Sequence, residues 1–267
     1  MRHIIAHYHI FKNAGSTVDT ILQRNFGRLW GSIEGNNPWD TLSPDSILRY
    51  ALAHPTLKAI SSHHARPPVP IDSNTVFHPL IFLRHPIDRV GSVYSFERRE
   101  PKSSPGLGVK IARKNDFAGY VRWRLSDGNG AVIKNFQTVH LSGREKDMRT
   151  ASASEKDLGD AMERISHLPF FGIVEMFDDS IVRMKTQLAQ YFGQIDTNYT
   201  VANQSAERKK MLLERLDEIE DALGTGLYQE LLDKNALDMQ LYDKAVKLFE
   251  LQGAARSPLK NAGDSKG

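Results

Sequence analysis

The sequence predicts an α/β protein whose central, mainly parallel sheet is covered by helices on both faces. Two observations lead to this fold class. A strand pattern, a small-residue loop and a helix pattern follow one another at residues 4–27 and again at residues 75–99, and strands that alternate with helices favour parallel pairing. From about residue 179 the chain carries helix patterns only. We expect this helical C-terminal third to pack against one edge of the sheet.

The first unit opens the chain. Residues 4–11 alternate and are rich in β-branched and aromatic side chains, which predicts a strand. Residues 12–17 are small and polar and form a loop. Apolar residues at helical spacing then predict a helix, and Gly27 is a natural stop for it.

The second unit follows a mixed segment in which residues 44–52 predict a short helix, residues 57–62 a short strand, and residues 66–70 a proline-rich loop. Residues 75–83 are strongly apolar, as expected for a buried strand. A proline at the first helical position then opens a helix over residues 86–99.

The rest of the chain is mostly helical. Residues 100–115 are basic and rich in Gly and Pro, and we expect a mobile loop there, a candidate substrate lid. Ser154 and Asp157 resemble a capping box for a helix that runs to about His167. The other expected elements are a strand at 170–174 and helices at 116–125, 179–192, 205–222, 226–233 and 236–251.

We expect one domain at residues 1–252 and a disordered tail at residues 253–267, which contain almost no large apolar side chain. Apolar residues make up 40% of the chain and charged residues 25%, which excludes collagen-like, coiled-coil and wholly disordered classes. Cysteine is absent, which excludes disulfides, a thiol nucleophile and cysteine-bound metals.

Charge and hydropathy narrow the class of protein further. Lys and Arg exceed Asp and Glu by 35 to 32, an excess too small to indicate a nucleic-acid partner. No apolar run approaches the ~20 residues of a membrane span, and histidines interrupt the apolar N-terminal stretch, which is unlike a signal peptide. We expect a soluble, cytoplasmic protein without a membrane span.

The loop FKNAGST after the first strand is a candidate anion site. Small residues let backbone N–H groups approach a ligand, and the following helix adds the positive end of its dipole, which suits phosphate or sulfate. Lys12 adds a charge at the loop entrance. The loop is not a Walker A motif, because the lysine precedes the small residues. An ordinary turn with an exposed lysine is an equal alternative.

Arg84 and Ser92 form a second candidate. Arg84 ends a buried strand, where open α/β sheets bind ligands, and Ser92 lies about two helical turns further on. A guanidinium suits phosphate recognition, and a hydroxyl at this spacing can share the ligand. The alternative is that Arg84 pairs with a carboxylate such as Asp88 and that Ser92 only packs.

Histidines supply the remaining candidates. His63 or His64 could serve as a general base near neutral pH, and only one of two neighbours should face the site; the alternative is a surface or hydrogen-bonded pair. His7 and His9 share one strand face at a spacing compatible with metal binding. Because no third ligand is evident, we favour hydrogen-bonded histidines there and predict no metal site.

Together these pieces resemble the carbohydrate sulfotransferase family, in the branch of bacterial sulfotransferases and the heparan and dermatan sulfate 2-O-sulfotransferases. FKNAGST resembles the family's PKTGGT-type loop for the 5′-phosphosulfate of 3′-phosphoadenosine-5′-phosphosulfate (PAPS). Residues 84–94 resemble its RxPxxRxxSxY segment for the 3′-phosphate. Ser62-His63 resembles its Gly-His element, whose histidine is the catalytic base.

Three later segments match the family in the same order. Residues 135–143 (NFQTVHLSG) resemble its NxQTRxLxG segment, residues 172–180 (GIVEMFDDS) its GLTERFDES segment, and residues 237–242 its LDxxLY helix. The resemblance thus runs from about residue 4 to 250. The chain departs from the pattern at Asn13-Ala14, at Ser62 and at Val139-His140.

The resemblance implies a P-loop-NTPase-like three-layer sandwich and in-line transfer of a sulfuryl group from PAPS to an acceptor hydroxyl. It implies that His63 accepts the proton of that hydroxyl and that Lys12 neutralises charge on the departing phosphate. The backbone N–H groups of residues 15–17 would hold the phosphosulfate. The implied cofactor-binding residues are Lys12, Asn13, Ala14, Gly15, Ser16, Thr17, Arg84 and Ser92.

Two other functions stay open. One is a nucleotide-dependent phosphotransferase on a related P-loop fold, which would need a magnesium-binding carboxylate. The other is a module that binds nucleotide or glycan without catalysis. The resemblance implies a carbohydrate or glycolipid acceptor; residues 100–115 and 122–124 are either a contact for an anionic acceptor or a solvated basic face. The C-terminal helices either form a homo-oligomer or pack on the core.

Overall fold

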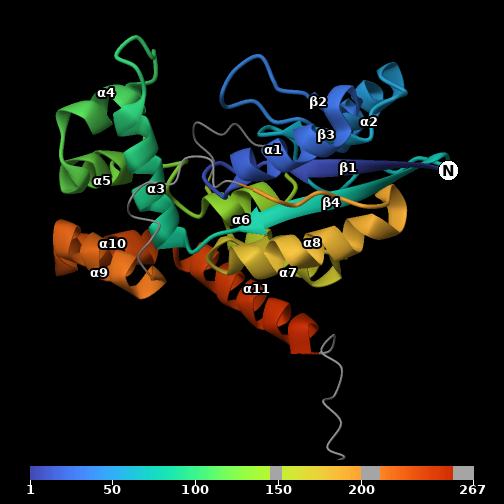
Figure 1. The fold of residues 1–267 in the computed structure, drawn as a ribbon. Coiled ribbons are helices and arrows are strands. Elements are labelled where there is room, and N and C mark those ends of the chain that lie inside the picture. The colour runs from blue at the N-terminus through green and yellow to red at the C-terminus, as the bar shows by residue number, and fades with distance from the viewer. Residues whose placement is uncertain (145–151, 200–210, 255–267) are drawn as a thin grey trace, which may run out of the picture.

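The structure is a computed structural model that describes residues 1–144, 152–199 and 211–254 (Figure 1). In these residues a parallel five-stranded sheet, in the order β2-β3-β1-β4-β5, forms the centre of the molecule, which confirms the expected α/β class. The strands are β1 (Arg2–Tyr8), β2 (Trp30–Ser32), β3 (Ala59–Ser62), β4 (Thr75–Leu83) and β5 (Gly172–Ile173).

Helices account for most of the remaining residues. They are α1 (Gly15–Phe26), α2 (Pro44–Ala53), α3 (Pro86–Arg99), α4 (Leu107–Lys114), α5 (Phe117–Leu125), α6 (Phe136–Leu141), α7 (Glu155–His167), α8 (Phe177–Phe192), α9 (Leu212–Leu223), α10 (Thr225–Lys234) and α11 (Ala236–Ala254). Short 3₁₀ turns, η1 (Gly27–Leu29) and η2 (Val174–Met176), follow α1 and β5.

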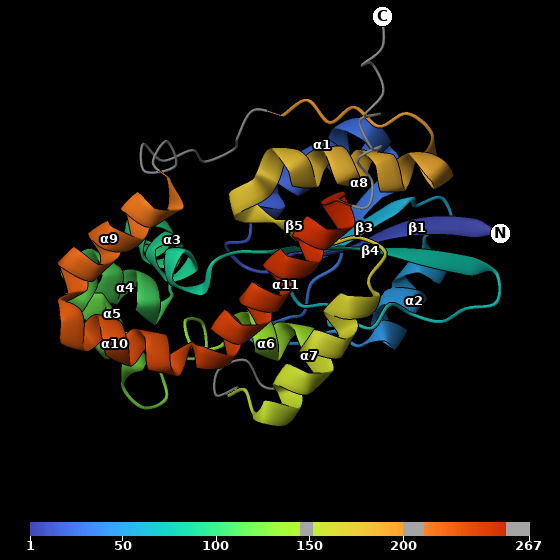
Figure 2. The ribbon, with the colours of Figure 1, turned by 90° about the horizontal axis from the view of Figure 1, so that it is seen from below.

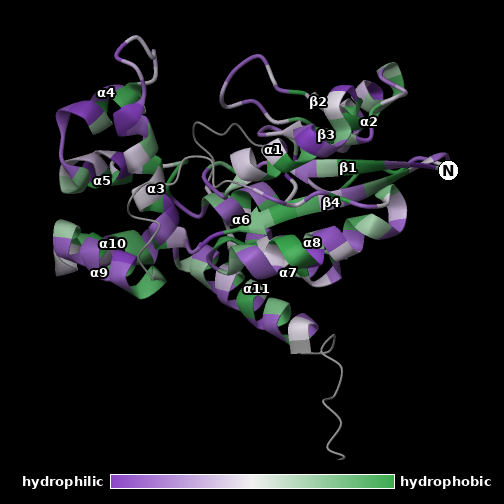
Figure 3. Cartoon of the chain, in the orientation of Figure 1, coloured by the Kyte–Doolittle hydropathy of each residue, from purple (hydrophilic) through white to green (hydrophobic). Residues whose placement is uncertain are grey.

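Helices cover both faces of the sheet (Figure 2). Neighbouring strand residues point to opposite faces, so Ile4 packs with α2, α6, α7 and α11, whereas Ile5 packs with α1 and α8. Figure 3 shows the hydrophobic character of β4, whose residues are almost all buried, as expected for a strand enclosed between two helical layers.

A third hydrophobic cluster lies beside the sheet and joins α3, α4, α5, α9 and α10 (Figure 1). The expectation that the whole C-terminal third packs against one edge is therefore only partly right. Helices α9 and α10 lie in this lateral cluster, but α8 and α11 each cover a face of the sheet, because their buried residues continue the two central cores.

Several elements occur where the sequence predicts them. β4 and α3 begin and end at the predicted residues, and Ser154 and Asp157 form a reciprocal capping box at the start of α7. β1 is shorter than expected and ends at Tyr8, because the Ile10 N–H turns back to donate to the Tyr8 carbonyl oxygen at 2.9 Å. The predicted helix at 205–222 overlaps α9, and its start lies outside the described residues.

The prediction of a mobile loop over residues 100–115 is wrong for its second half. Residues 107–114 form α4, which packs on α3 through buried Val109 and Ala112. Of the predicted tail at 253–267, residues 253 and 254 belong to α11, and the rest lie outside the described residues. No helix in the described part of the chain is long and apolar enough to cross a membrane.

The short helix α6 was not predicted, and a tertiary contact explains it. Its first turn is capped by Asp238 of α11, whose carboxylate accepts from the N–H groups of Gln137 at 3.0 Å and Thr138 at 2.7 Å. In return, the Asn135 side-chain oxygen accepts from the N–H groups of Leu237 and Asp238, at the first turn of α11. Each helix therefore supplies the cap of the other.

Candidate functional site

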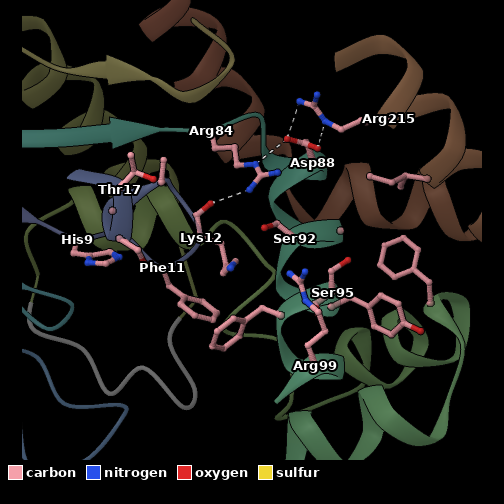
Figure 4. Close-up of a pocket in the computed structure, with 18 of the residues that line it drawn as sticks. His9, Phe11, Lys12, Thr17, Arg84, Asp88, Ser92, Ser95, Arg99 and Arg215 are labelled. Atoms are coloured by element: carbon pink, nitrogen blue, oxygen red, sulfur yellow. Dashed lines mark hydrogen bonds and ion pairs between the residues drawn. The ribbon is translucent and has the colours of Figure 1, made fainter. Parts of the chain in front are cut away.

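The carboxyl ends of β1, β3 and β4 bring the candidate residues together. These three strands are adjacent and parallel, so the segments that follow Tyr8, Ser62 and Leu83 leave the sheet at the same edge. A cavity of about 390 Å³ opens there (Figure 4). Of the sequence-predicted site residues, Lys12, Ala14, Gly15, Ser16, Thr17, His63, Arg84 and Ser92 line this cavity.

Asn13 is the predicted residue whose side chain does not reach the cavity. It is 1% exposed, and its Nδ2 donates to the Phe82 carbonyl oxygen at 2.8 Å and to Oε1 of Gln137 at 2.7 Å. Its backbone N–H donates to the Ile10 carbonyl. Asn13 therefore anchors the loop from below, and its side chain is not available to a ligand.

The loop after β1 presents the N-terminus of α1 to the cavity. Lys12 and Ala14, the two neighbours of Asn13, have φ values of 66° and 62°. Both therefore adopt the left-handed conformation, which turns the chain sharply into the helix. Within the described residues, no acceptor contacts the N–H groups of Ala14, Gly15 and Ser16. The N–H of Thr17 donates to the Ala14 carbonyl, so the open donors lie one residue earlier than expected.

The cavity has an excess of positive charge. Four cationic side chains line it, Lys12, Arg84, Arg99 and Arg215, against the two carboxylates of Asp88 and Glu218, which leaves a formal charge of +2 with neutral histidines. Together with the first turn of α1, this arrangement favours an anionic ligand. Phe11, Tyr94, Phe96 and Phe117 supply an aromatic wall, so the ligand can also carry an apolar or ring-shaped part.

Arg84 and Asp88 form the ion pair that the sequence left open as an alternative. Nε of Arg84 lies 2.8 Å from Oδ2 of Asp88, and its Nη1 donates to the Lys12 carbonyl oxygen at 3.1 Å. Arg215 of α9 contacts the same carboxylate, with Nε 2.7 Å from Oδ1. Burial raises the pKa of Asp88, but the two guanidiniums outweigh burial and hold that pKa below its usual value.

Arg84 nevertheless keeps the capacity to bind an anion. Its Nη2 has no acceptor within the described residues, and the same holds for the hydroxyl of Ser92. Figure 4 shows Ser92, Ser95 and Arg99 along the face of α3 that borders the cavity, with Arg84 just before the start of that helix. The Arg84–Asp88 pair thus fixes the guanidinium in place and leaves one of its nitrogens and the serine hydroxyl for a ligand.

Of the adjacent histidines, His63 lines the cavity, whereas His64 turns away from it. The His64 Nδ1 accepts from the Gly35 N–H at 2.7 Å. The His63 Nδ1 lies 3.0 Å from the His9 carbonyl oxygen; because a carbonyl only accepts, this nitrogen carries the proton and Nε2 keeps a lone pair. Burial, and next the neighbouring His9, lower the pKa of His63 to about 4, so its imidazole is neutral at pH 7.

His7 and His9 are hydrogen-bonded, as favoured from the sequence, through a carboxylate that sequence spacing did not reveal. Each Nδ1 lies 2.8 Å from a different oxygen of Asp19, on α1. Burial raises the pKa of Asp19, but the two imidazoles outweigh it and hold the pKa well below its usual range. Asp19 is thus the third group that the sequence did not reveal, and the ligand atoms of the trio lie within 4.8 Å of one another, a spacing compatible with a metal ion as well as with these hydrogen bonds.

Lys12 lines the cavity and extends towards α3. Its Nζ is 4.4 Å from the centroid of the Phe96 ring, a cation–π contact on the α3 side of the site. Figure 4 shows the side chain between Phe11 and Ser95 rather than against the first turn of α1. A ligand at that turn would draw the ammonium towards itself by rotation of the flexible lysine stem.

The later sequence segments lie behind the cavity and support it. Gln137 receives the Arg84 N–H at 3.0 Å and donates to the Arg84 carbonyl at 2.8 Å, besides its bond to Asn13. Glu175 accepts from the His85 N–H and from the Tyr242 hydroxyl. These contacts, buried at Gln137 and partly buried at Glu175, tie the loops after β1 and β4 to the helical layer, so the segments at 135–143, 172–180 and 237–242 act as a scaffold.

No family model matches the chain. An uncharacterized protein of Archaeoglobus fulgidus is 32% identical to it over 265 residues, which covers 93% of this chain and 98% of the relative. The two proteins therefore correspond over nearly their whole lengths.

Proposed function

We propose that this chain, which belongs to the same family as the Archaeoglobus fulgidus protein, is a sulfotransferase that transfers the sulfuryl group of PAPS to an acceptor hydroxyl. One observation supports the proposal above all: the first turn of α1, the Arg84–Ser92 pair and the lone pair of His63 face the same positively charged cavity. Such a cavity supplies two anion subsites and a proton acceptor within a single space.

The donor set fits this cofactor. The open N–H groups of Ala14, Gly15 and Ser16 would hold the phosphosulfate, and Arg84 Nη2 with the Ser92 hydroxyl would hold the 3′-phosphate. The aromatic wall offers a surface for the nucleoside. When bound, PAPS supplies an activated sulfuryl group on a phosphate leaving group.

The strand order and the loop between β1 and α1 support a P-loop-NTPase-like three-layer sandwich as the fold. The loop differs from a Walker A motif in chemistry, because Lys12 precedes the helix and reaches the site from the loop itself. Charge from lysine, arginine and the helix dipole would thus hold the anion.

His63 and Lys12 would divide the chemistry between them. Neutral His63 accepts the proton of the attacking hydroxyl at Nε2, because its Nδ1–H is fixed on the His9 carbonyl. The negative charges of Glu34 and Asp19 oppose the effect of burial on the pKa of His63. Lys12 stabilises the negative charge that develops on the leaving phosphate oxygen.

The phosphotransferase alternative is less well supported. It would need a carboxylate free to hold magnesium, and of the two that line the cavity, Asp88 and Glu218, the buried Asp88 is committed to Arg84 and Arg215. The proposed acceptor is a hydroxyl of a carbohydrate or glycolipid, in line with the sulfotransferase resemblance.

Calorimetric titration with adenosine 3′,5′-bisphosphate, the product nucleotide, tests the proposal, with AMP as the ligand that lacks the 3′-phosphate. We expect AMP to bind at least about tenfold more weakly, the equivalent of one charge-assisted hydrogen bond. In Arg84→Gln and Ser92→Ala the two nucleotides should bind with equal affinity. Arg122 is an exposed residue on α5, and Arg122→Ala should keep the difference in affinity between the two nucleotides. Equal binding of both ligands by the unmodified protein would refute the assignment.

A further inference from the structure

We propose that His9 is a second imidazole of the binding site: it takes up a proton when the nucleotide binds and then donates a hydrogen bond from Nε2 to the anion at the first turn of α1. The identity of that anion, a phosphosulfate or phosphate, rests on the proposed function. His9 is 7% exposed and takes no part in the proton transfer assigned to His63.

The tautomer of His9 follows from its partner. Nδ1 lies 2.8 Å from Oδ2 of Asp19, and an ionised carboxylate only accepts hydrogen bonds. The proton of neutral His9 is therefore on Nδ1, and its Nε2 carries a lone pair. His7 occupies the other oxygen of Asp19 at 2.8 Å, so the carboxylate holds both rings in a fixed orientation.

The open edge of the His9 ring lies against the start of α1. A Cβ atom on Gly15, the first residue of that helix, would be 2.0 Å from Cδ2 of His9 and 2.3 Å from Nε2. His9 also lines the cavity. The Nε2 edge thus packs against the first residue of α1, next to the N–H groups of residues 14–16 that have no acceptor among the described residues.

A neutral His9 does not suit a bound anion. Its Nε2 lone pair would face oxygen lone pairs, which is repulsive, whereas a protonated Nε2 would donate a charge-assisted hydrogen bond. Asp19 stabilises the resulting imidazolium from the other side of the ring, as carboxylates commonly do for histidines that act in binding sites. The His9 ring therefore lies between the first residue of α1 and the Asp19 carboxylate, with one ring edge towards each.

Several groups keep the proton off His9 in the free protein. Burial is the largest cause of its lowered pKa, and His7 on β1 and Lys12 in the loop add to it, against the opposing effect of Asp19 on α1. The His63 ring, whose centroid lies 3.8 Å away, and the positive end of α1 also face it. A bound dianion reverses this balance, because its charge favours the imidazolium.

During turnover the two histidines would act differently. His63 receives the proton of the acceptor hydroxyl as the new O–S bond forms. His9 keeps its proton throughout and donates a hydrogen bond to an oxygen that gains charge as the S–O bond to the 5′-phosphate breaks. The proton that His9 holds comes from solvent on binding and returns there on product release, so the chemistry of transfer needs no further reactant.

Proton uptake on binding of adenosine 3′,5′-bisphosphate tests the proposal without any turnover. Calorimetry at pH 7.5 in buffers of different ionisation enthalpy gives the number of protons taken up on binding. The ligand phosphates, whose second pKa is about 6, are already dianionic at this pH. We expect uptake approaching about one proton, and an affinity that falls by up to ~tenfold per pH unit as the pH rises.

Matched variants assign the proton. His9→Gln should abolish most of the uptake and flatten the pH dependence of affinity, whereas His63→Gln should retain most of it, and His54→Gln, an exposed histidine on another face, should match the unmodified protein. If His9→Gln unfolds, ring ¹⁵N spectra of the unmodified protein, with the other histidines assigned by substitution, should show Nε2 of His9 becoming protonated on nucleotide addition.

Three outcomes would overturn the proposal. Nucleotide binding without proton uptake, or uptake that is unchanged in His9→Gln, would refute the role of His9 and leave the proposed function standing. Stoichiometric divalent metal bound by His7, His9 and Asp19 would also refute it, because a metal would take the place of the Nδ1 proton. No binding of the nucleotide at all would refute the proposed function and this inference together.

Discussion

Gly15→Ala should destabilise the protein, although alanine normally favours a helix over glycine. A Cβ at position 15 would lie 2.0–2.5 Å from three atoms of the His9 ring, far inside the normal ~3.5–4.0 Å contact. The His9 ring cannot shift at low cost, because Asp19 holds its Nδ1 at 2.8 Å and the His63 ring packs against it with a centroid distance of 3.8 Å.

The magnitude follows from opposing effects. Overpacking costs about 1–3 kcal/mol and loss of the bond to Asp19 about 1.5–3 kcal/mol, while the helix propensity of alanine returns at most ~1 kcal/mol. With partial relaxation we expect a net loss of about 2 kcal/mol in the free energy of unfolding, or a fall of about 5 °C in Tm.

Urea unfolding monitored by circular dichroism measures this loss. The matched control is Gly159→Ala in the exposed part of α7, where a Cβ would meet nothing within 4 Å; it should stabilise the protein by up to ~1 kcal/mol. In a His9→Ala background, Gly15→Ala should cost nothing, because the clash is gone. Stabilisation by Gly15→Ala alone, or an equal cost in both backgrounds, would refute the packing argument.

Three further predictions concern charge and capping. Asp19 has a lowered pKa in the folded protein, so its contribution to stability is present above pH ~4, the unfolded value, and is lost as the pH falls; Asp19→Asn should therefore show a shallower acid limb in unfolding titrations, and an unchanged limb would contradict this. Asp238→Ala leaves two buried N–H groups of α6 without an acceptor and should cost about 3 kcal/mol in urea unfolding, against little for exposed Asp243→Ala; similar costs for both would be contrary evidence. His63→Gln should lower sulfuryl transfer by about 10²–10⁴-fold with nucleotide affinity nearly unchanged, and near-normal turnover in a transfer assay would remove His63 from the chemistry.

Elements with strong local signals could be predicted from the sequence. The bounds of β4 and α3 coincide with the predicted ones, because an uninterrupted apolar run and a proline at the first helical turn are local features. Helix α6 could not be predicted, because a carboxylate a hundred residues away in the sequence, Asp238, caps it. Helix α4 could not be predicted either. The segment before it is rich in glycine and proline, which favours a loop, and the helix depends on the burial of Val109 and Ala112 against α3.

The site shows the same division. That Lys12, His63 and Arg84 meet could be foreseen, because each follows a strand of one parallel sheet and such strands present their carboxyl ends at one edge. Asp19 and Arg215 could not, because their roles depend on pairing between segments that no short-range pattern connects. The sequence predicts that Asn13 faces the ligand, whereas its side chain points inward. Only its hydrogen bonds to Phe82 and Gln137 reveal this orientation.

Gln137 gives the site a consequence that reaches beyond stability. One amide side chain bonds both the loop after β1, through Asn13, and the chain at Arg84 that follows β4. In the proposed function this amide link would set the separation between the two anion subsites before a ligand arrives, and with it the distance between the charged groups of a ligand that fits. A change of loop sequence that keeps this amide link can alter the chemistry at either end without changing the length of molecule that is accepted.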